Sequence, residues 1–148
     1  MKYDAYTELR VTDDFSIIDF ISDGTKGAIP KRISFTSTEM ENVYNLAFGD
    51  IMENGEIDDY TISDNGDRNK ILATVANVVD NYTNKYPERW VFFRGSTKER
   101  TRLYRIAVSN NFDELCKKFD IYGYVGEELV VFCKGMEINA FLVKRKFV

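Results

Sequence analysis

The residues best suited to chemistry stand in one arginine-rich segment, Arg94–Arg105. Inside it, the small-residue turn Gly95-Ser96-Thr97 separates an apolar run from a polar run with helical spacing. Free backbone N–H groups at the first turn of a helix attract anions, and the planar guanidinium group matches phosphate or carboxylate. We therefore expect an anion or an acidic partner to bind this segment. The predicted contact residues are Arg94, Ser96, Thr97, Lys98, Arg100, Arg102 and Arg105.

Three of these cations fall on one side of the predicted helix. At about 100° per residue, Lys98, Arg102 and Arg105 share a single stripe. Like charges at these spacings repel, so something negative is expected to face them. An external anion, a nucleic acid, an acidic protein or the chain's own carboxylates would each serve. Ser96 and Glu99 also have the spacing of a capping box, in which Glu99 would occupy the backbone donors that an anion needs.

The charge of the chain is divided unevenly along its 148 residues. Residues 1–67 carry 5 Lys/Arg and 15 Asp/Glu, a net charge of −10, whereas residues 68–148 carry 15 and 9, a net charge of +6. This division predicts either that the two halves attract each other or that one face recognises an anion. A homo-oligomer in which the acidic and basic halves of neighbouring copies meet is a third possibility.

The composition closes several routes to catalysis. The chain has no histidine, which excludes Ser-His-Asp and Cys-His nucleophiles and histidine metal sites. Its two cysteines cannot make a Cys₄ zinc site. We expect no cofactor, no resident metal and no catalytic residue. No apolar run reaches the roughly 18 residues of a membrane span, and the N-terminus lacks the apolar stretch of a signal peptide, so we expect a cytoplasmic protein.

An enzyme built from this chain would depend on carboxylates. Asp50, Asp58 and Asp59 could hold Mg²⁺ for hydrolysis of a phosphodiester, with an arginine neutralising the phosphate. Asp64 and Asp67 follow them in the sequence. The alternative is that these residues form a solvated loop edge and supply negative charge to the start of a helix.

The elements that must position these residues follow from periodicity. Alternation predicts strands at Phe15–Ser22 and Ala28–Ser37, and a second hairpin, Val43–Met52 with Ile57–Ser63, turning at Asn54-Gly55. A helix is predicted from about Asp67 to Tyr86, ended by Pro87. Strand Arg89–Arg94 is expected to be central, with Trp90 and Phe92 in the core, and parallel to Ile57–Ser63. The remaining predictions are helices over Lys98–Val108 and Phe112–Phe119, the second capped by Asn111 with Glu114, the hairpin Ile121–Val125 with Leu129–Cys133, and strand Ala140–Lys146.

Together these elements predict a single α+β domain over residues 1–148. It has one mixed, mostly antiparallel sheet of about seven strands in the order ββββ-α-β-αα-βββ, with one long helix and two short helices on one face.

Two motifs resemble an uncharacterised bacterial domain family of unknown function. The first is Asn65-Gly66-Asp67 followed by Lys70-Ile71-Leu72-Ala73-Thr74-Val75, and the second is Arg94-Gly95-Ser96-Thr97 followed by Arg100-Thr101-Arg102-Leu103-Tyr104. The resemblance covers most of the chain, including the turn at 24–27. It implies Pro-Ala in many members where this chain has Lys98-Glu99. The family carries no known activity, substrate or site.

The function we expect is therefore that of a non-enzymatic interaction module. It would engage an acidic protein or a nucleic acid through the arginine-rich segment, in the manner of a small toxin–antitoxin pair. The metal-dependent phosphodiester hydrolase is the alternative.

Overall fold

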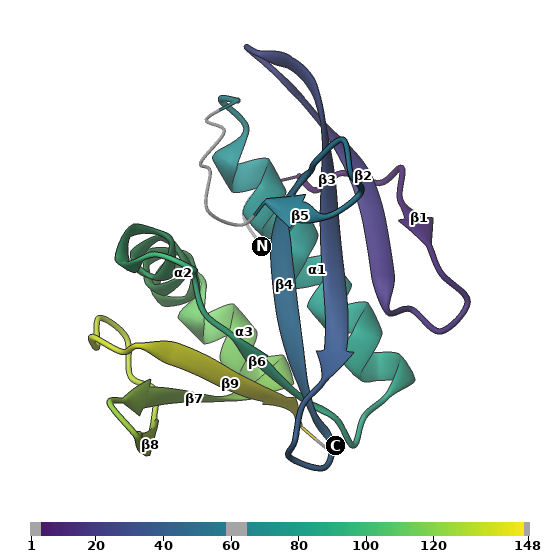
Figure 1. Cartoon of the computed structure of the whole chain (residues 1–148). Helices are drawn as coiled ribbons and strands as arrows, with labels where there is room; N and C mark the ends of the chain where they lie inside the picture. Colours follow the sequence, from purple (N-terminus) through teal and green to yellow (C-terminus); the bar gives the residue numbers. More distant parts are fainter. Residues whose placement is uncertain (1–3, 59–64, 147–148) are drawn as a thin grey trace. The chain divides into compact units, whose positions relative to one another are not determined.

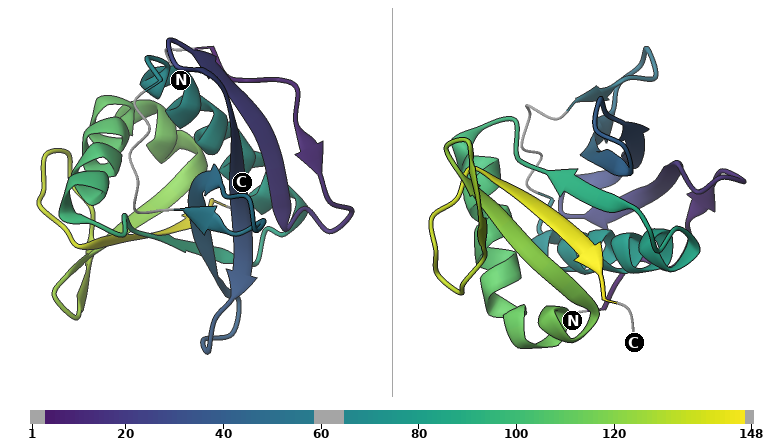
Figure 2. Two further views of the ribbon diagram at one scale, coloured as in Figure 1. Left: turned by 45° about the horizontal axis from the view of Figure 1, so that its top comes forward. Right: turned by 90° about the horizontal axis from the view of Figure 1, so that it is seen from below.

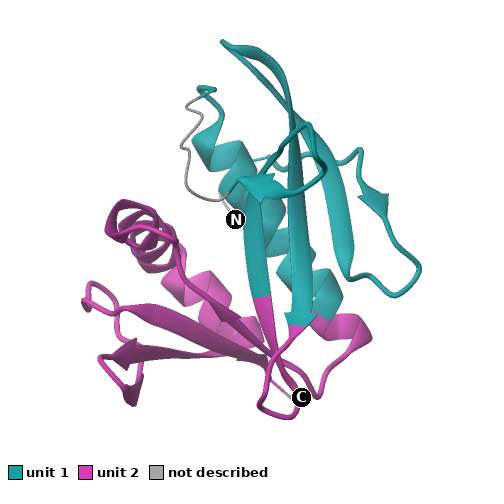
Figure 3. Cartoon of the chain, in the orientation of Figure 1, with its two compact units in different colours: residues 1–36, 46–82 teal, residues 37–45, 83–148 magenta. Residues whose placement is uncertain are grey.

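The computed structural model describes residues 4–58 and 65–146, which divide into two compact units (Figures 1 and 3). Unit 1 comprises residues 1–36 and 46–82, and unit 2 comprises residues 37–45 and 83–148. The chain is α+β, with one mixed sheet that has nine strands within the described ranges. The elements are β1 Arg10–Val11, β2 Ile17–Gly24, β3 Gly27–Ser37, β4 Val43–Ile51, β5 Ile57–Asp58, α1 Arg68–Lys85, β6 Trp90–Phe93, α2 Lys98–Asn110, α3 Phe112–Lys118, β7 Phe119–Val125, β8 Glu128–Val131 and β9 Ala140–Arg145.

Unit 1 buries one face of the β2–β3 hairpin against α1. Alternation places Ile18 of β2 opposite Ile33 of β3, and neither side chain is exposed to solvent. The ring of Phe35 stacks on Tyr82 of α1 with 3.7 Å between centroids. The helix predicted over Asp67–Tyr86 is confirmed as α1, and its buried residues recur at helical spacing. It ends before Pro87, which cannot continue it.

Unit 2 is built on the strand order β6-β9-β7-β8, all antiparallel. Val91 of β6 and Phe141 of β9 are fully buried on one face of this sheet. Helices α2 and α3 cover that same face, as ring contacts between Phe93 and Tyr104 and between Phe112 and Phe132 show (Figure 2). The predicted placement of the two shorter helices on one face therefore holds within unit 2.

The direction of β6 relative to the strand that begins at Ile57 was predicted wrongly. β6 pairs in parallel with the first residues of β4, with Val43 opposite Trp90, whereas β5 pairs antiparallel with the last residues of β4. The two strands of a hairpin run in opposite directions, so only one of them can be parallel to β6, and hairpin chemistry does not say which. The remainder of the predicted strand at 57–63 lies outside the described residues.

Two further predictions are corrected by the structure. Five strands precede α1 instead of four, because the two-residue strand β1 is too short to show a periodic pattern. Asn111 makes no side-chain cap to α3, and its Nδ2 instead donates to the Ala107 carbonyl at the end of α2, at 2.8 Å. The last turn of α2 thus uses the side chain that the Asn111–Glu114 spacing assigned to the next helix.

Candidate functional site

The start of α2 is fastened to the end of β6 through Gly95. The Gly95 N–H donates to Oγ1 of Thr101 at 3.0 Å. A Cβ atom at Gly95 would lie 2.4 Å from the backbone nitrogen of Thr101 and 2.4 Å from Cβ of Arg100. Only glycine lets the turn approach the helix this closely, so the turn holds the first residues of α2 in a defined position.

Thr97 caps α2, and the predicted Ser96–Glu99 capping box is wrong. Thr97 has extended backbone angles, and its Oγ1 accepts from the Arg100 N–H at 3.2 Å. Its carbonyl accepts from the Thr101 N–H at 3.1 Å, which is the first bond of the helix. Adjacent Ser and Thr are both good caps, and the contact between Gly95 and Thr101 sets the helix start one residue later than the spacing suggested. Glu99 still lies in the first turn, where its charge favours the helix dipole.

Arg100 points inward from the same turn. Only 8% of its surface is exposed. Together with the Thr97 cap, it makes the first turn of α2 part of the packed structure. Two of the seven predicted contact residues, Thr97 and Arg100, therefore position the segment.

Three cations on one side of α2 form a basic face, defined here as Lys98, Arg102 and the half-buried Arg105. Lys98 and Arg102 are exposed, and no described carboxylate of unit 2 lies within ion-pair distance of either. Nη1 of Arg105 lies 3.8 Å from Oε1 of Glu137, whose side chain is 91% exposed. Such a long, solvated pair neutralises little charge. The basic face therefore remains positive within unit 2.

Arg94 and Ser96, two further predicted contact residues, are exposed. Arg94 follows the last residue of β6, and Ser96 lies in the turn that leads to Thr97. Ile106, one helical turn after Arg102, is 44% exposed. The basic face thus carries an apolar side chain at its border.

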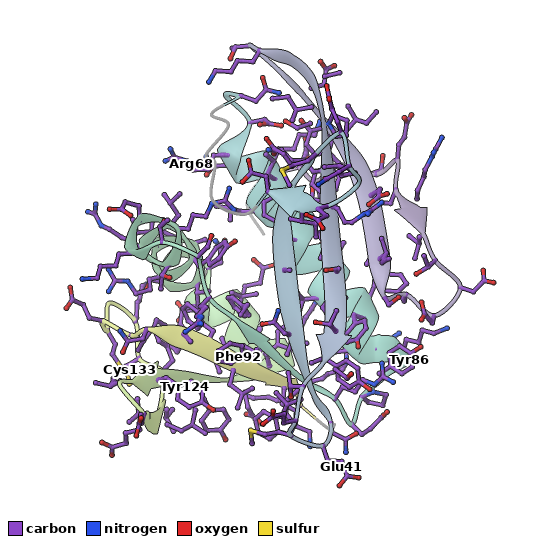
Figure 4. All side chains as sticks on the ribbon, in the orientation of Figure 1. Glu41, Arg68, Tyr86, Phe92, Tyr124 and Cys133 are labelled. Carbon is purple, nitrogen blue, oxygen red and sulfur yellow. The ribbon has the colours of Figure 1, made fainter. Side chains whose placement is uncertain are left out.

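The sheet face opposite α2 and α3 carries four aromatic residues that the sequence did not place there. Trp90 and Phe92 were expected in the core, yet both are half-buried, with Tyr122 5.7 Å from Trp90 and Tyr124 5.9 Å from Phe92 between ring centroids (Figure 4). Nζ of Lys144 lies 5.2 Å from the Trp90 ring. The alternation Tyr122-Gly123-Tyr124 was the available signal, because it sends both tyrosines to the same side of a strand.

The acidic residues proposed for a metal are arranged for other contacts. Asp50 lies opposite Asp58 in the β4–β5 register, and the buried Nζ of Lys31 makes an ion pair with Asp50. Asp59 and Asp64 lie outside the described residues. No group of three or more His, Cys, Asp or Glu side chains that could hold a metal ion occurs in the part of the chain that the structure describes.

The Asn65-Gly66-Asp67 motif fastens the β2–β3 turn to the start of α1. The Asn65 Nδ2 donates to Oγ of Ser22 at 3.0 Å and to the Gly27 carbonyl at 2.9 Å, while its Oδ1 accepts from the Lys26 N–H at 2.6 Å. Oδ2 of Asp67 accepts from the hydroxyls of Ser22, at 2.6 Å, and Tyr6. The motif thus organises structure in unit 1.

None of the helices in the described ranges is both long and apolar enough to cross a membrane. No curated protein and no solved structure matches the chain. One family profile does, over residues 2–146, and its description is a family of unknown function, DUF6934. That match spans nearly the whole sequence and agrees with the predicted resemblance to a family of unknown function. The chain belongs to the DUF6934 family of unknown function.

Proposed function

We propose that this protein is a non-enzymatic binding module whose basic face on α2 engages an anionic partner. The observation that carries the proposal is the exposure of Lys98 and Arg102 and the lack of an ion pair to either within the described part of unit 2. Both are exposed on one stripe, on a helix whose first turn is fixed by the Thr97 cap and the Gly95 contact, and no described carboxylate of unit 2 pairs with them. A rigid helix presents these charges with little loss of conformational freedom on binding.

Charge distribution supports an anionic partner. Residues 37–45 and 83–148 carry 13 Lys/Arg and 10 Asp/Glu, a net charge of +3, within a chain of net charge −4. The positive surplus is thus concentrated in the unit that bears the basic face. Complementary charge would speed association and select for acidic surfaces.

An acidic protein surface fits this face better than a nucleic acid does. The basic face is short, with three cations on one helix, and Ile106 adds an exposed apolar side chain at its border. Helix-in-groove recognition uses such mixed apolar and charged stripes. Broad phosphate binding needs a larger basic surface, and the acidic balance of the chain, with a pI near 5.0, opposes it.

Affinity capture with matched charge reversals tests the proposal. Arg102→Glu places a negative charge in the basic face, and Lys117→Glu makes the same change at an exposed position of α3. We expect the proteins retained by the immobilised wild type to be lost with Arg102→Glu and kept with Lys117→Glu. Equal retention by the two variants would remove the proposal.

A second arm separates the two classes of partner. A fluorescein-labelled single strand of about 20 nucleotides, added to the purified protein, reports nucleic-acid binding by anisotropy. We expect no change in anisotropy at near-physiological salt. Tight binding that Arg102→Glu abolishes and Lys117→Glu keeps would retain the basic face as the site and replace the acidic protein with a nucleic acid.

A further inference from the structure

Strand β8 is an edge strand with an apolar surface. It is the last strand in the sheet order, and β7 is its one strand partner among the described residues. Leu129 is 44% exposed and Val131 is 66% exposed, and Cys133, just beyond the strand, is exposed as well (Figure 4). Large exposed apolar residues thus gather on an unpaired sheet edge.

This edge lacks the usual protection against pairing. Soluble proteins guard exposed edges with charges, with prolines or by keeping the strand very short. At the other end of the sheet order, β1 has two residues, one of them Arg10. In contrast, β8 has a single charge, at its first residue Glu128, and the run Leu129-Val130-Val131-Phe132-Cys133, which continues two residues past the strand, contains no charge and has high β-propensity. Such a run on an edge favours the addition of another strand.

The backbone of β8 is oriented to accept that strand. The Phe132 N–H donates to the Ile121 carbonyl on β7 at 3.0 Å. In an antiparallel pair, hydrogen-bonding groups point alternately toward one neighbour and then the other. The N–H and C=O groups of Leu129 and Val131 therefore point away from β7. They are the groups that a further strand would pair with.

The charges at the two ends of this uncharged run indicate what the added strand is. Glu127 and Glu128 stand at one end of the uncharged run, and Lys134 stands at the other. If a second β8 is laid antiparallel beside the first, each glutamate end meets a lysine end, whereas a parallel arrangement brings like charges together. The charges of this run are therefore complementary to those of a second copy that lies antiparallel to it.

We propose that β8 pairs antiparallel with β8 of a second copy of this chain, across a two-fold axis at Val131. Side chains that face the same side of the sheet then lie opposite each other. Val131 would meet the partner's Val131, Leu129 would meet the partner's Cys133, and Glu128 would lie beside the partner's Lys134. The sheet of unit 2 would continue into the second copy, and its exposed apolar edge would be covered.

This dimer is independent of the proposed function. It uses the edge of the unit 2 sheet, whereas the basic face lies on α2 and points away from that sheet. It also differs from an oligomer in which acidic and basic halves meet, because it requires no contact between regions of opposite net charge beyond the ends of β8.

Disulfide cross-linking tests the two-fold axis. Opposite residues of a hydrogen-bonded antiparallel pair have Cα atoms about 5.5 Å apart, within the range of a disulfide. In a background with Cys116→Ser and Cys133→Ser, we expect Val131→Cys to form a covalent dimer rapidly under mild oxidation. The control is Ile106→Cys in the same background, which places a cysteine at another exposed position, on α2 (44% exposed at Ile106 and 66% at Val131). Equal rates for the two variants would overturn the proposal.

Charge variants and molar mass test the register. By light scattering, the wild type should have twice the chain mass of 17.2 kDa, and Val131→Lys should reduce it to the monomer. Glu128→Lys should raise the dimer dissociation constant by roughly 5–30-fold, and Glu128→Lys with Lys134→Glu should restore it. A monomeric wild type contradicts the proposal. A second contradicting result is a monomeric wild type that captures a different protein and no longer captures it after Val131→Lys. In that case β8 would pair with a strand of that other protein.

Discussion

The residues of the arginine-rich segment divide into two groups with different tasks. Gly95, Thr97, Arg100 and Thr101 face inward or bond to the backbone, and they fix where α2 begins. Lys98 and Arg102 face solvent. Helical spacing puts Arg100 on the opposite side of α2 from Lys98 and Arg102, but it does not say which of the two groups is buried. The structure separates them by direction, and the proposed function rests on the second group alone.

The identity of the cap can be tested by substitution at Thr97. We expect Thr97→Ala to lower the free energy of unfolding by about 1 kcal/mol, because the Arg100 N–H loses its acceptor. Thr97→Ser keeps the hydroxyl and should lie within a few tenths of the wild type. Urea denaturation of the three proteins measures this. Equal losses for both variants would show that the hydroxyl does not cap the helix.

Tyr6 gives the chain a dependence on alkaline pH. Burial first, and then the hydrogen bond that its hydroxyl donates to Asp67, raise the pKa of Tyr6 above its ordinary value of 10.0. A raised pKa in the folded state means that the stabilisation is complete below pH about 10 and is lost as the pH climbs through the folded pKa.

We therefore expect Tyr6→Phe to weaken the pH dependence of stability above pH 10. The urea midpoint of the wild type should fall between pH 9 and pH 11 by more than the midpoint of the variant does. The other eight tyrosines, common to both proteins, cancel in the difference. Parallel curves for the two proteins would contradict a role for Tyr6.

At the scale of elements, the Asn65 side chain links the β2–β3 turn to α1. Asn65 is 1% exposed, and its side chain makes four hydrogen bonds, to the Ser22 hydroxyl, the Ser22 carbonyl, the Gly27 carbonyl and the Lys26 N–H. We expect Asn65→Ala to cost about 2 kcal/mol of stability, since buried polar groups lose their partners. The control Asn77→Ala changes an exposed position of α1 and should cost less than about 0.5 kcal/mol. Thermal unfolding of both variants decides whether the link is energetically important.

Periodicity and turn chemistry were sufficient to predict most helices and strands from the sequence. The apolar spacing of α1 predicted it to within two residues at each end. The Asn54-Gly55 turn was found because the left-handed backbone that it requires is tolerated by both residue types, and Gly55 indeed has φ of 84°. These features depend on local sequence alone.

Features that depend on distant contacts could not be predicted. β6 pairs with β4 although α1 separates the two strands in the sequence. The strand order, in which β9 lies between β6 and β7, also leaves no signal in the local sequence. Distant contacts also decide which residue caps a helix. Asn111 stands between two helices and has suitable chemistry for either end, and the geometry of α2 decides in favour of the Ala107 carbonyl.

For the whole molecule, the choice between a binding module and an enzyme depends on the acidic strand ends. Lys31 already supplies a cation to Asp50, so a metal ion would have to displace an ammonium group from it. We expect Mg²⁺ at millimolar concentration to leave the melting temperature unchanged. A bound ion at ten times its dissociation constant would stabilise the fold by about 1.4 kcal/mol, a shift of several degrees. A rise of that size would favour the hydrolase.

The candidate site was only half accessible from the sequence. The segment was found because arginines at helical spacing are unusual in an acidic chain. The half-buried aromatic face of β6 and β7 was not predicted, because an apolar run looks the same whether one or both of its faces are covered.

We propose that the basic face of α2 meets an anionic protein. A photo-cross-linking amino acid at Ile106, one helical turn from Arg102, reports this contact directly in cells that express the protein natively. We expect a cross-linked adduct from Ile106 that disappears when Arg102→Glu is added, and no such adduct from the same probe at Lys117. Adducts that are identical from both positions, or that persist with Arg102→Glu, would contradict it.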